Sequence, residues 1–108
     1  MRRAAKVDAN QPEIVEAFRR AGCTVEHLHG VGKGCPDLAV SYGGVTHFAE
    51  VKDGSLPPSA RQLNADQVKW HAATRGTVHV VTVVEEALEV AALLKLQAAW
   101  IHHHEVTE

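Results

Sequence analysis

Long apolar runs are missing from the chain, and neither sign of charge is in marked excess. No apolar stretch reaches the length of a membrane span, so we expect no membrane association. The basic start Met1-Arg2-Arg3 is not followed by a hydrophobic region, so we expect no signal peptide and a cytoplasmic location. With a net charge of −2, the molecule as a whole does not attract nucleic acid. Binding of nucleic acid would therefore require a local basic patch.

Cysteine is scarce as well, with Cys23 and Cys35 the only two in the chain. In an intracellular protein they are expected to be reduced thiols rather than a disulfide. Together with His27 and His29 they could form a Cys₂His₂ zinc site, although the spacing matches no common zinc module. The three histidines at 102–104 fall in a C-terminal tail, and we interpret them as solvated residues rather than as a metal site.

Internal repeats and low-complexity segments are also absent. The length of 108 residues suffices for one domain with a single core. Apolar residues at 45% and charged residues at 22% are ordinary values for a globular protein, which favours a folded core. We therefore expect one domain over residues 1–108, with a core from about residue 8 to 98 and flexible termini.

Capping signals predict a first helix over about residues 11–21. Asn10 and Glu13 form a potential capping box at its start. Gln11 falls within the apolar stripe of this helix, so its side chain should face the interior or the sheet. A polar side chain in that position needs a partner, which is either the backbone at the helix start or a metal-bound water.

Further elements follow from a second capping box and from short apolar or alternating runs. Asn64 and Gln67 form this box, at the start of a helix that should end at Gly76. The other expected elements are strands over 24–29, 38–42, 45–52 and 77–83, the last of them buried, and a final helix over 85–100. The order α-β-β-β-α-β-α places a crossover helix before the last strand. It predicts an α/β fold with a mixed β-sheet flanked by helices, in which the last strand is parallel to an earlier one.

Two carboxylates should meet across the hairpin that Gly43-Gly44 closes. These glycines tolerate the positive φ angles of a two-residue turn, and the register counted back from them places Asp37 opposite Glu50. Lys52 lies two residues beyond Glu50 and shares its face. Like charges that oppose each other across a ladder destabilise it, so a compensating divalent cation such as Mg²⁺ is expected. The alternative is an Asp37 in a turn and a solvated Glu50–Lys52 pair on an edge strand.

Three motifs in this order resemble the PD-(D/E)xK nuclease superfamily. They are Pro36-Asp37, Glu50-Val51-Lys52 and, on the following helix, Gln67. Within that superfamily the chain is most similar to the compact VRR-NUC and archaeal Holliday-junction-resolvase-like nucleases, which include small phage-encoded members. The match covers nearly the whole chain, from residue 8 to about residue 94. It implies a restriction-endonuclease-like mixed β-sheet flanked by helices.

The resemblance implies a metal-dependent DNA endonuclease that hydrolyses phosphodiester bonds and is selective for junction or branched DNA. Asp37, Glu50 and the backbone carbonyl of Val51 would hold Mg²⁺ or Mn²⁺. Lys52 would orient or activate the attacking water and offset charge on the phosphate, and Gln67 would support the site.

A departure from the family pattern concerns the first helix, which in these nucleases often supplies a glutamate to the metal. This chain has Gln11 at that position, and Gln11 therefore joins the candidate catalytic set in place of a third carboxylate. Glu13 is a poorer substitute because it points to the opposite side of the helix.

DNA is the expected partner, and the candidate phosphate contacts are Lys33, Arg61 and Lys69, with the basic residues at 2, 3 and 6. Cutting both strands of a junction requires two sites, so the resemblance also suggests a homodimer. Two other classes of function are open. One is a nucleic-acid-binding module that keeps the fold but has lost cleavage, and the other is a structural or assembly protein in which the hairpin forms a dimer edge.

Overall fold

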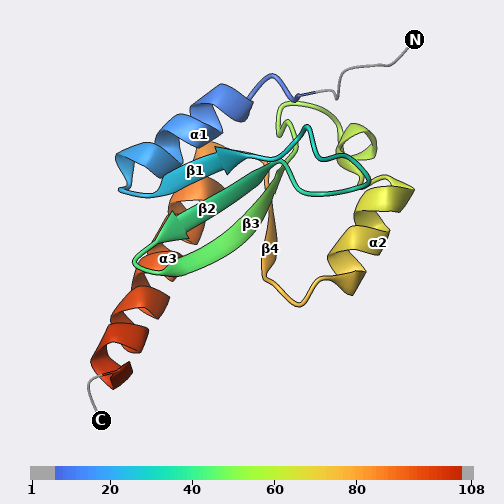
Figure 1. Cartoon of the computed structure of the whole chain (residues 1–108). Helices are drawn as coiled ribbons and strands as arrows, with labels where there is room; N and C mark the ends of the chain where they lie inside the picture. Colours follow the sequence, from blue (N-terminus) through green and yellow to red (C-terminus); the bar gives the residue numbers. More distant parts are fainter. Residues whose placement is uncertain (1–6, 106–108) are drawn as a thin grey trace.

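The computed structural model describes residues 7–105, which form an α/β domain of one four-stranded sheet and three α-helices (Figure 1). The elements in chain order are α1 (Gln11–Arg20), β1 (Thr24–His27), β2 (Leu38–Tyr42), β3 (Val45–Val51), the 3₁₀ turn η1 (Pro58–Arg61), α2 (Ala65–Ala73), β4 (Val78–Val81) and α3 (Val84–Glu105). The expected mixed sheet with flanking helices is therefore confirmed. No helix in this part of the chain is long and apolar enough to cross a membrane.

The sheet has the strand order β1-β2-β3-β4. The first three strands are antiparallel neighbours, and β4 lies parallel to β3 with Val81 beside Val51. The expected parallel last strand is confirmed, but its expected burial is not. β4 forms an edge of this sheet, where only Val81 is fully enclosed and Val80 is 44% exposed. The apolar sequence of this segment predicted a buried strand. Within residues 7–105, however, no further strand pairs with the outer edge of β4.

The turn between β2 and β3 sets the register of the hairpin. Gly43 and Gly44 both have positive φ, at 56° and 88°, as a two-residue hairpin turn requires. Tyr42 pairs with Val45 and the ladder continues to Leu38 opposite Ala49, which confirms the register expected from the sequence. Alternate residues of β3 consequently lie on opposite faces of the sheet.

One face of the sheet packs against α1 and α3 and holds the core. The side chains that are completely enclosed there come from both helices and from β2, β3 and the end of β4: Ile14, Phe18, Leu38, Val40, Ala49, Val51, Val81, Ala87 and Leu94. α3 runs on to Glu105, beyond the expected end near residue 100, and leads away from the sheet (Figure 1). The histidines at 102–104 are exposed, as expected, but they continue the helix.

The start of α1 is tied to the ends of two strands rather than capped. Asn10 has a helical backbone conformation and its side chain makes no cap hydrogen bond, so the expected capping box with Glu13 is wrong. Its amide Nδ2 instead donates to the carbonyl oxygens of Lys52 and Thr82, each at 3.0 Å. These bonds fix the first turn of α1 close to the carboxyl ends of β3 and β4.

α2 stands apart from α1 and α3 (Figure 1) and covers part of the opposite face of the sheet. Its capping box is confirmed, because Asn64 accepts from the Gln67 backbone and the Gln67 side chain accepts from the Asn64 backbone. None of its side chains is fully buried. Trp70 packs edge-to-face on Phe48 of β3, with ring centroids 5.1 Å apart. The position of α2 thus depends on few contacts, several of which belong to the pocket described below.

Gly34 allows the loop before β2 to approach the start of α2. Its φ is +83°, and a Cβ at this position would collide with the backbone carbonyl of Asp66. We predict that Gly34→Ala lowers the free energy of unfolding by about 2–4 kcal/mol, the sum of a left-handed backbone and an overpacked contact.

Gly32→Ala is the matched control for this effect. Gly32 also has a positive φ, of +77°, but a Cβ there would meet nothing within 4 Å. Only the backbone cost of about 1–2 kcal/mol should remain. Denaturant unfolding of both variants measures the difference, and equal losses would show that the loop does not pack on α2 as described.

Candidate metal centre

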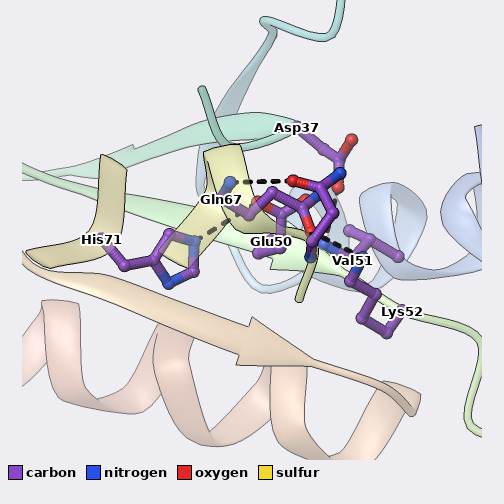
Figure 2. Close-up of polar contacts among 7 residues, drawn as sticks. Asp37, Glu50, Val51, Lys52, Gln67 and His71 are labelled. Atoms are coloured by element: carbon purple, nitrogen blue, oxygen red, sulfur yellow. Dashed lines mark hydrogen bonds and ion pairs between the residues drawn. The ribbon is translucent and has the colours of Figure 1, made fainter. Parts of the chain in front are cut away.

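A pocket of about 450 Å³ gathers four of the charged residues singled out from the sequence, Lys33, Asp37, Glu50 and Lys52. Asp37 directly precedes β2, Glu50 is the penultimate residue of β3, and Lys52 follows that strand. The Leu38–Ala49 pair ends the β2–β3 ladder and leaves Asp37 next in line opposite Glu50. Figure 2 shows the side chains of Asp37 and Glu50 close together, with Gln67 and His71 reaching in from α2.

The backbone holds Asp37 firmly in this position. Its carboxylate Oδ2 accepts a hydrogen bond of 2.7 Å from the backbone N–H of Val51. Its carbonyl oxygen accepts another bond of 2.7 Å from the N–H of Leu28, just beyond β1. The carboxylate therefore lies across the end of β3, beside the Glu50 side chain, with little freedom to move away from it.

Glu50 is a carboxyl group enclosed by protein, since only 2% of its surface is exposed. Burial, followed by the hydrogen bond and negative charge of Asp37, raises the pKa of Glu50 from its ordinary 4.5 to about 8. The positive charge of Lys52 acts in the opposite direction but does not outweigh these effects. In the absence of a cation, Glu50 consequently holds a proton near neutral pH and shares a hydrogen bond with Asp37.

Gln67 joins the start of α2 to Glu50 near the end of β3 and to Lys52 just after that strand. Its Oε1 accepts from Lys52 Nζ at 3.0 Å and from the Asn64 backbone N–H at 2.9 Å, and its Nε2 donates to Glu50 Oε2 at 3.2 Å. The residue that caps the helix therefore also orients the lysine and the buried carboxyl. Gln67, which the motif singled out, therefore lies within hydrogen-bond distance of both Lys52 and Glu50.

His71 was not expected in the site. It lies one helical turn after Gln67, and its Nε2 is 3.4 Å from Glu50 Oε1. Burial, and then the charge of Lys52, lowers the pKa of His71, so the imidazole is neutral at physiological pH. The i, i+4 spacing from Gln67 was the available signal, because residues four apart share a helix face.

Asp8 was also missed, although its carboxylate belongs to a residue that lines this pocket. Its negative charge contributes to the raised pKa of Glu50. Asp8 lies in the segment that leads into α1, where its carbonyl oxygen accepts from the Gln11 backbone N–H at 3.0 Å. Asp8 precedes α1, so the helical periodicity that distinguishes Gln11 from Glu13 gives no signal for it.

The remaining candidates are placed differently. Lys33 lines the pocket and has a positive φ of 55°, which is unusual for a residue with a side chain. Arg61 donates from Nε to the Leu56 carbonyl, and Lys69 is exposed on α2; neither lines this pocket. Gln11 lines a different cavity and contacts His27. The basic residues at 2, 3 and 6 lie outside the described part of the chain.

The donor set fits a hard divalent cation at an open site. Asp37 and Glu50 supply carboxylate oxygens, and Mg²⁺ is commonly held by one or two carboxylates, with water and phosphate oxygens completing its shell. Among residues 7–105, no group of three or more His, Cys, Asp and Glu side chains is placed so that it could hold a metal ion. The alternative zinc set therefore gains no support, and its members Cys23 and Cys35 are free thiols.

Comparison with known proteins assigns no family to the chain. No protein-family model matches it, and no curated protein or solved structure is significantly similar to it. A function is therefore inferred from the pocket itself, in which a buried carboxyl, a second carboxylate and a lysine lie at the end of one strand.

Proposed function

We propose that this protein is a Mg²⁺- or Mn²⁺-dependent DNA endonuclease with a restriction-endonuclease-like fold. The observation that carries the proposal is the pair of Asp37 and the enclosed Glu50, with Lys52 on the same side. Two carboxyl groups held together at low exposure destabilise the fold unless a proton or a cation joins them. The order of elements and the PD-(D/E)xK-like motifs are compatible with the same function.

In this proposal Asp37, Glu50 and the Val51 carbonyl hold the cation. A bound Mg²⁺ would supply a Lewis acid for the phosphate and lower the pKa of the attacking water. Asp37 is already oriented for this role by the Val51 N–H, and Glu50 by Gln67 and His71. These contacts reduce the reorganisation needed when the substrate binds.

Lys52 has the position needed to act on the phosphate. The ammonium group of Lys52 has three N–H donors, and one of them bonds to Gln67 Oε1. The other two remain for a water or a phosphate oxygen. Hydrolysis forms a bond from the water oxygen to phosphorus and breaks the bond from phosphorus to one sugar oxygen. The products are a terminal phosphate and a free hydroxyl. Lys52 offsets the negative charge that develops on the phosphate in the transition state.

The direct test is a cleavage panel with purified protein and Mg²⁺, Mn²⁺ or EDTA. Duplex, nicked, flapped and four-way DNA are the substrates, because the preferred structure defines the biological role. Cleavage of at least one substrate with either metal, and none in EDTA, is expected. A folded protein that binds these DNAs but cleaves none would instead favour a non-catalytic nucleic-acid-binding module. Junction cleavage should accompany a homodimer, which sedimentation would detect.

Gln67→Leu tests the support that α2 gives to the site. The change removes the side-chain bonds to Lys52 and Glu50, and we expect a 10- to 100-fold loss of kcat, typical for residues that orient metal ligands. The exposed Gln62→Leu is the control and should retain activity. Because Gln67 also belongs to the capping box, Mn²⁺ affinity should be measured beside thermal stability. Lower stability with unchanged Mn²⁺ affinity and kcat would limit its role to capping.

A further inference from the structure

A second cavity, of about 650 Å³, lies between α1 and the end of β1, and no role has yet been given to it. Its size falls in the range of small-molecule and cofactor pockets, roughly 300–1,000 Å³. Part of its wall is apolar and consists of Val7, Pro12 and Val15. His29 lines both this cavity and the candidate metal centre, so the two sites adjoin at that residue.

The cavity contains a buried amide with an unused acceptor. Gln11 is only 3% exposed, and its Oε1 has no hydrogen-bond partner among residues 7–105. Its Nε2 makes a long contact of 3.5 Å with His27 Nδ1. His29 Nδ1 is likewise buried and without a partner in the described chain. Unsatisfied buried polar groups cost free energy, so two such groups in residues that line one cavity favour a polar ligand there.

The rim of the cavity carries positive charge. Arg19 and Arg20 occupy the last turn of α1, and Glu16 offsets one of them through an ion pair of 3.1 Å with Arg20. The wall of the cavity thus combines apolar side chains, the rings of His27 and His29, which meet edge to face, and an amide that can both donate and accept. This chemistry matches a nucleobase, whose flat face can stack on one of these perpendicular rings and whose edge can bond to an amide, with its phosphate at the cationic rim.

We propose that this cavity receives one unpaired nucleobase of the DNA strand whose phosphate lies at the Asp37–Glu50 centre. The inference rests on the proposed nuclease function and narrows its substrate. A base inside a duplex is stacked and paired. It would have to leave the stack in order to pass His29 and enter this cavity. The substrate class is therefore DNA with an unpaired nucleotide beside the scissile phosphate, as at a flap, a branch point or a single-stranded end.

An abasic scan measures this contact without cleavage. Single-stranded DNA oligonucleotides, each lacking the base at one successive position, are titrated with the full-length protein in Ca²⁺ in place of Mg²⁺. Loss of the base that occupies the cavity should weaken binding roughly tenfold, the usual scale for one stacked base, at one position only. Gln11→Leu should weaken binding of the intact oligonucleotide by a similar factor and leave that of the abasic one unchanged.

Two controls keep a structural effect apart from base recognition. Gln11→Leu removes a buried acceptor that lacks a partner, so its thermal stability should equal or exceed that of the wild type. Gln97→Leu makes the same change on α3, away from both cavities, and should bind all oligonucleotides like the wild type. A less stable Gln11→Leu variant that binds intact and abasic DNA equally weakly would contradict the inference.

Other outcomes separate this inference from the function on which it rests. A flat abasic scan with normal metal-dependent cleavage would overturn the base pocket and leave the nuclease proposal standing. Saturable binding of free dAMP, reduced by Gln11→Leu, with a flat scan would identify a free-nucleotide site and also overturn it. Absence of both DNA binding and cleavage would instead refute the nuclease proposal.

Discussion

Asp37→Asn should reduce metal-dependent DNA cleavage by at least about 1,000-fold while the protein stays folded. Several kcal/mol of transition-state stabilisation depend on a cation held at this position, and each 1.4 kcal/mol changes the rate tenfold. The asparagine carbonyl can still accept the 2.7 Å bond from the Val51 N–H, so the end of β3 should be preserved. Removing one of two adjacent carboxylates should also leave thermal stability in EDTA unchanged or higher.

Asp66→Asn is the control for loss of one negative charge from the pocket. Asp66 lines the same cavity at its α2 side but is exposed. Asp66→Asn should cleave DNA within a few-fold of the wild-type rate. Its stability should fall only by the small contribution that an acidic residue makes near a helix start. Single-turnover rates of the three proteins give the comparison. Equal loss in both variants would point to the total charge of the pocket rather than to Asp37.

Glu50→Gln should stabilise the metal-free protein at alkaline pH, by about 4 kcal/mol near pH 8. In the folded wild type the pKa of Glu50 is raised to about 8, whereas in the unfolded chain it has its ordinary value of 4.5. The stability that comes from the protonated carboxyl is therefore fully present below pH 4.5 and lost as pH rises toward 8. The glutamine resembles the protonated carboxyl at every pH and avoids this loss.

The comparison is made by denaturant unfolding of both proteins in EDTA between pH 5 and 9. Their stabilities should diverge as pH rises, and Mg²⁺ should narrow the gap by stabilising only the wild type. Glu86→Gln provides a control of opposite sign, because hydrogen bonds from Thr82 hold the pKa of Glu86 below its ordinary value. That variant should be less stable than the wild type at neutral pH. A pH-independent difference for Glu50→Gln would refute the strained carboxyl pair.

The hairpin and its carboxylate pair were predictable because local rules determine them. Two glycines favour one turn geometry, and the period of two along a strand then assigns every facing pair from Tyr42–Val45 back to Leu38–Ala49, with Asp37 and Glu50 next in line. The Asn64–Gln67 box is equally local. Each of these predictions used residues within about 14 positions of one another, for which the chain itself limits the alternatives.

The missed features depend on contacts between distant segments. Asn10 looked like a cap but binds carbonyl groups of Lys52 and Thr82, which lie 42 and 72 residues away. Asp8 acts on Glu50 only because α1 is anchored there. Gln11 was correctly predicted to face inward, yet the helix periodicity did not specify which cavity it would meet. Propensity and spacing select a face of an element and leave its tertiary neighbour undetermined.

Mn²⁺ titration followed by amide NMR tests most directly whether the Asp37–Glu50 pair is a divalent-cation site. The paramagnetic ion broadens signals of nearby nuclei, and the Val51 N–H that bonds to Asp37 is the best-placed reporter. We predict early broadening of Val51 and Lys52 in the wild type and its loss in Asp37→Asn. Broadening first at Cys23, Cys35 and their neighbouring histidines, or at the histidines 102–104, or at none of these positions, would contradict the metal centre proposed here.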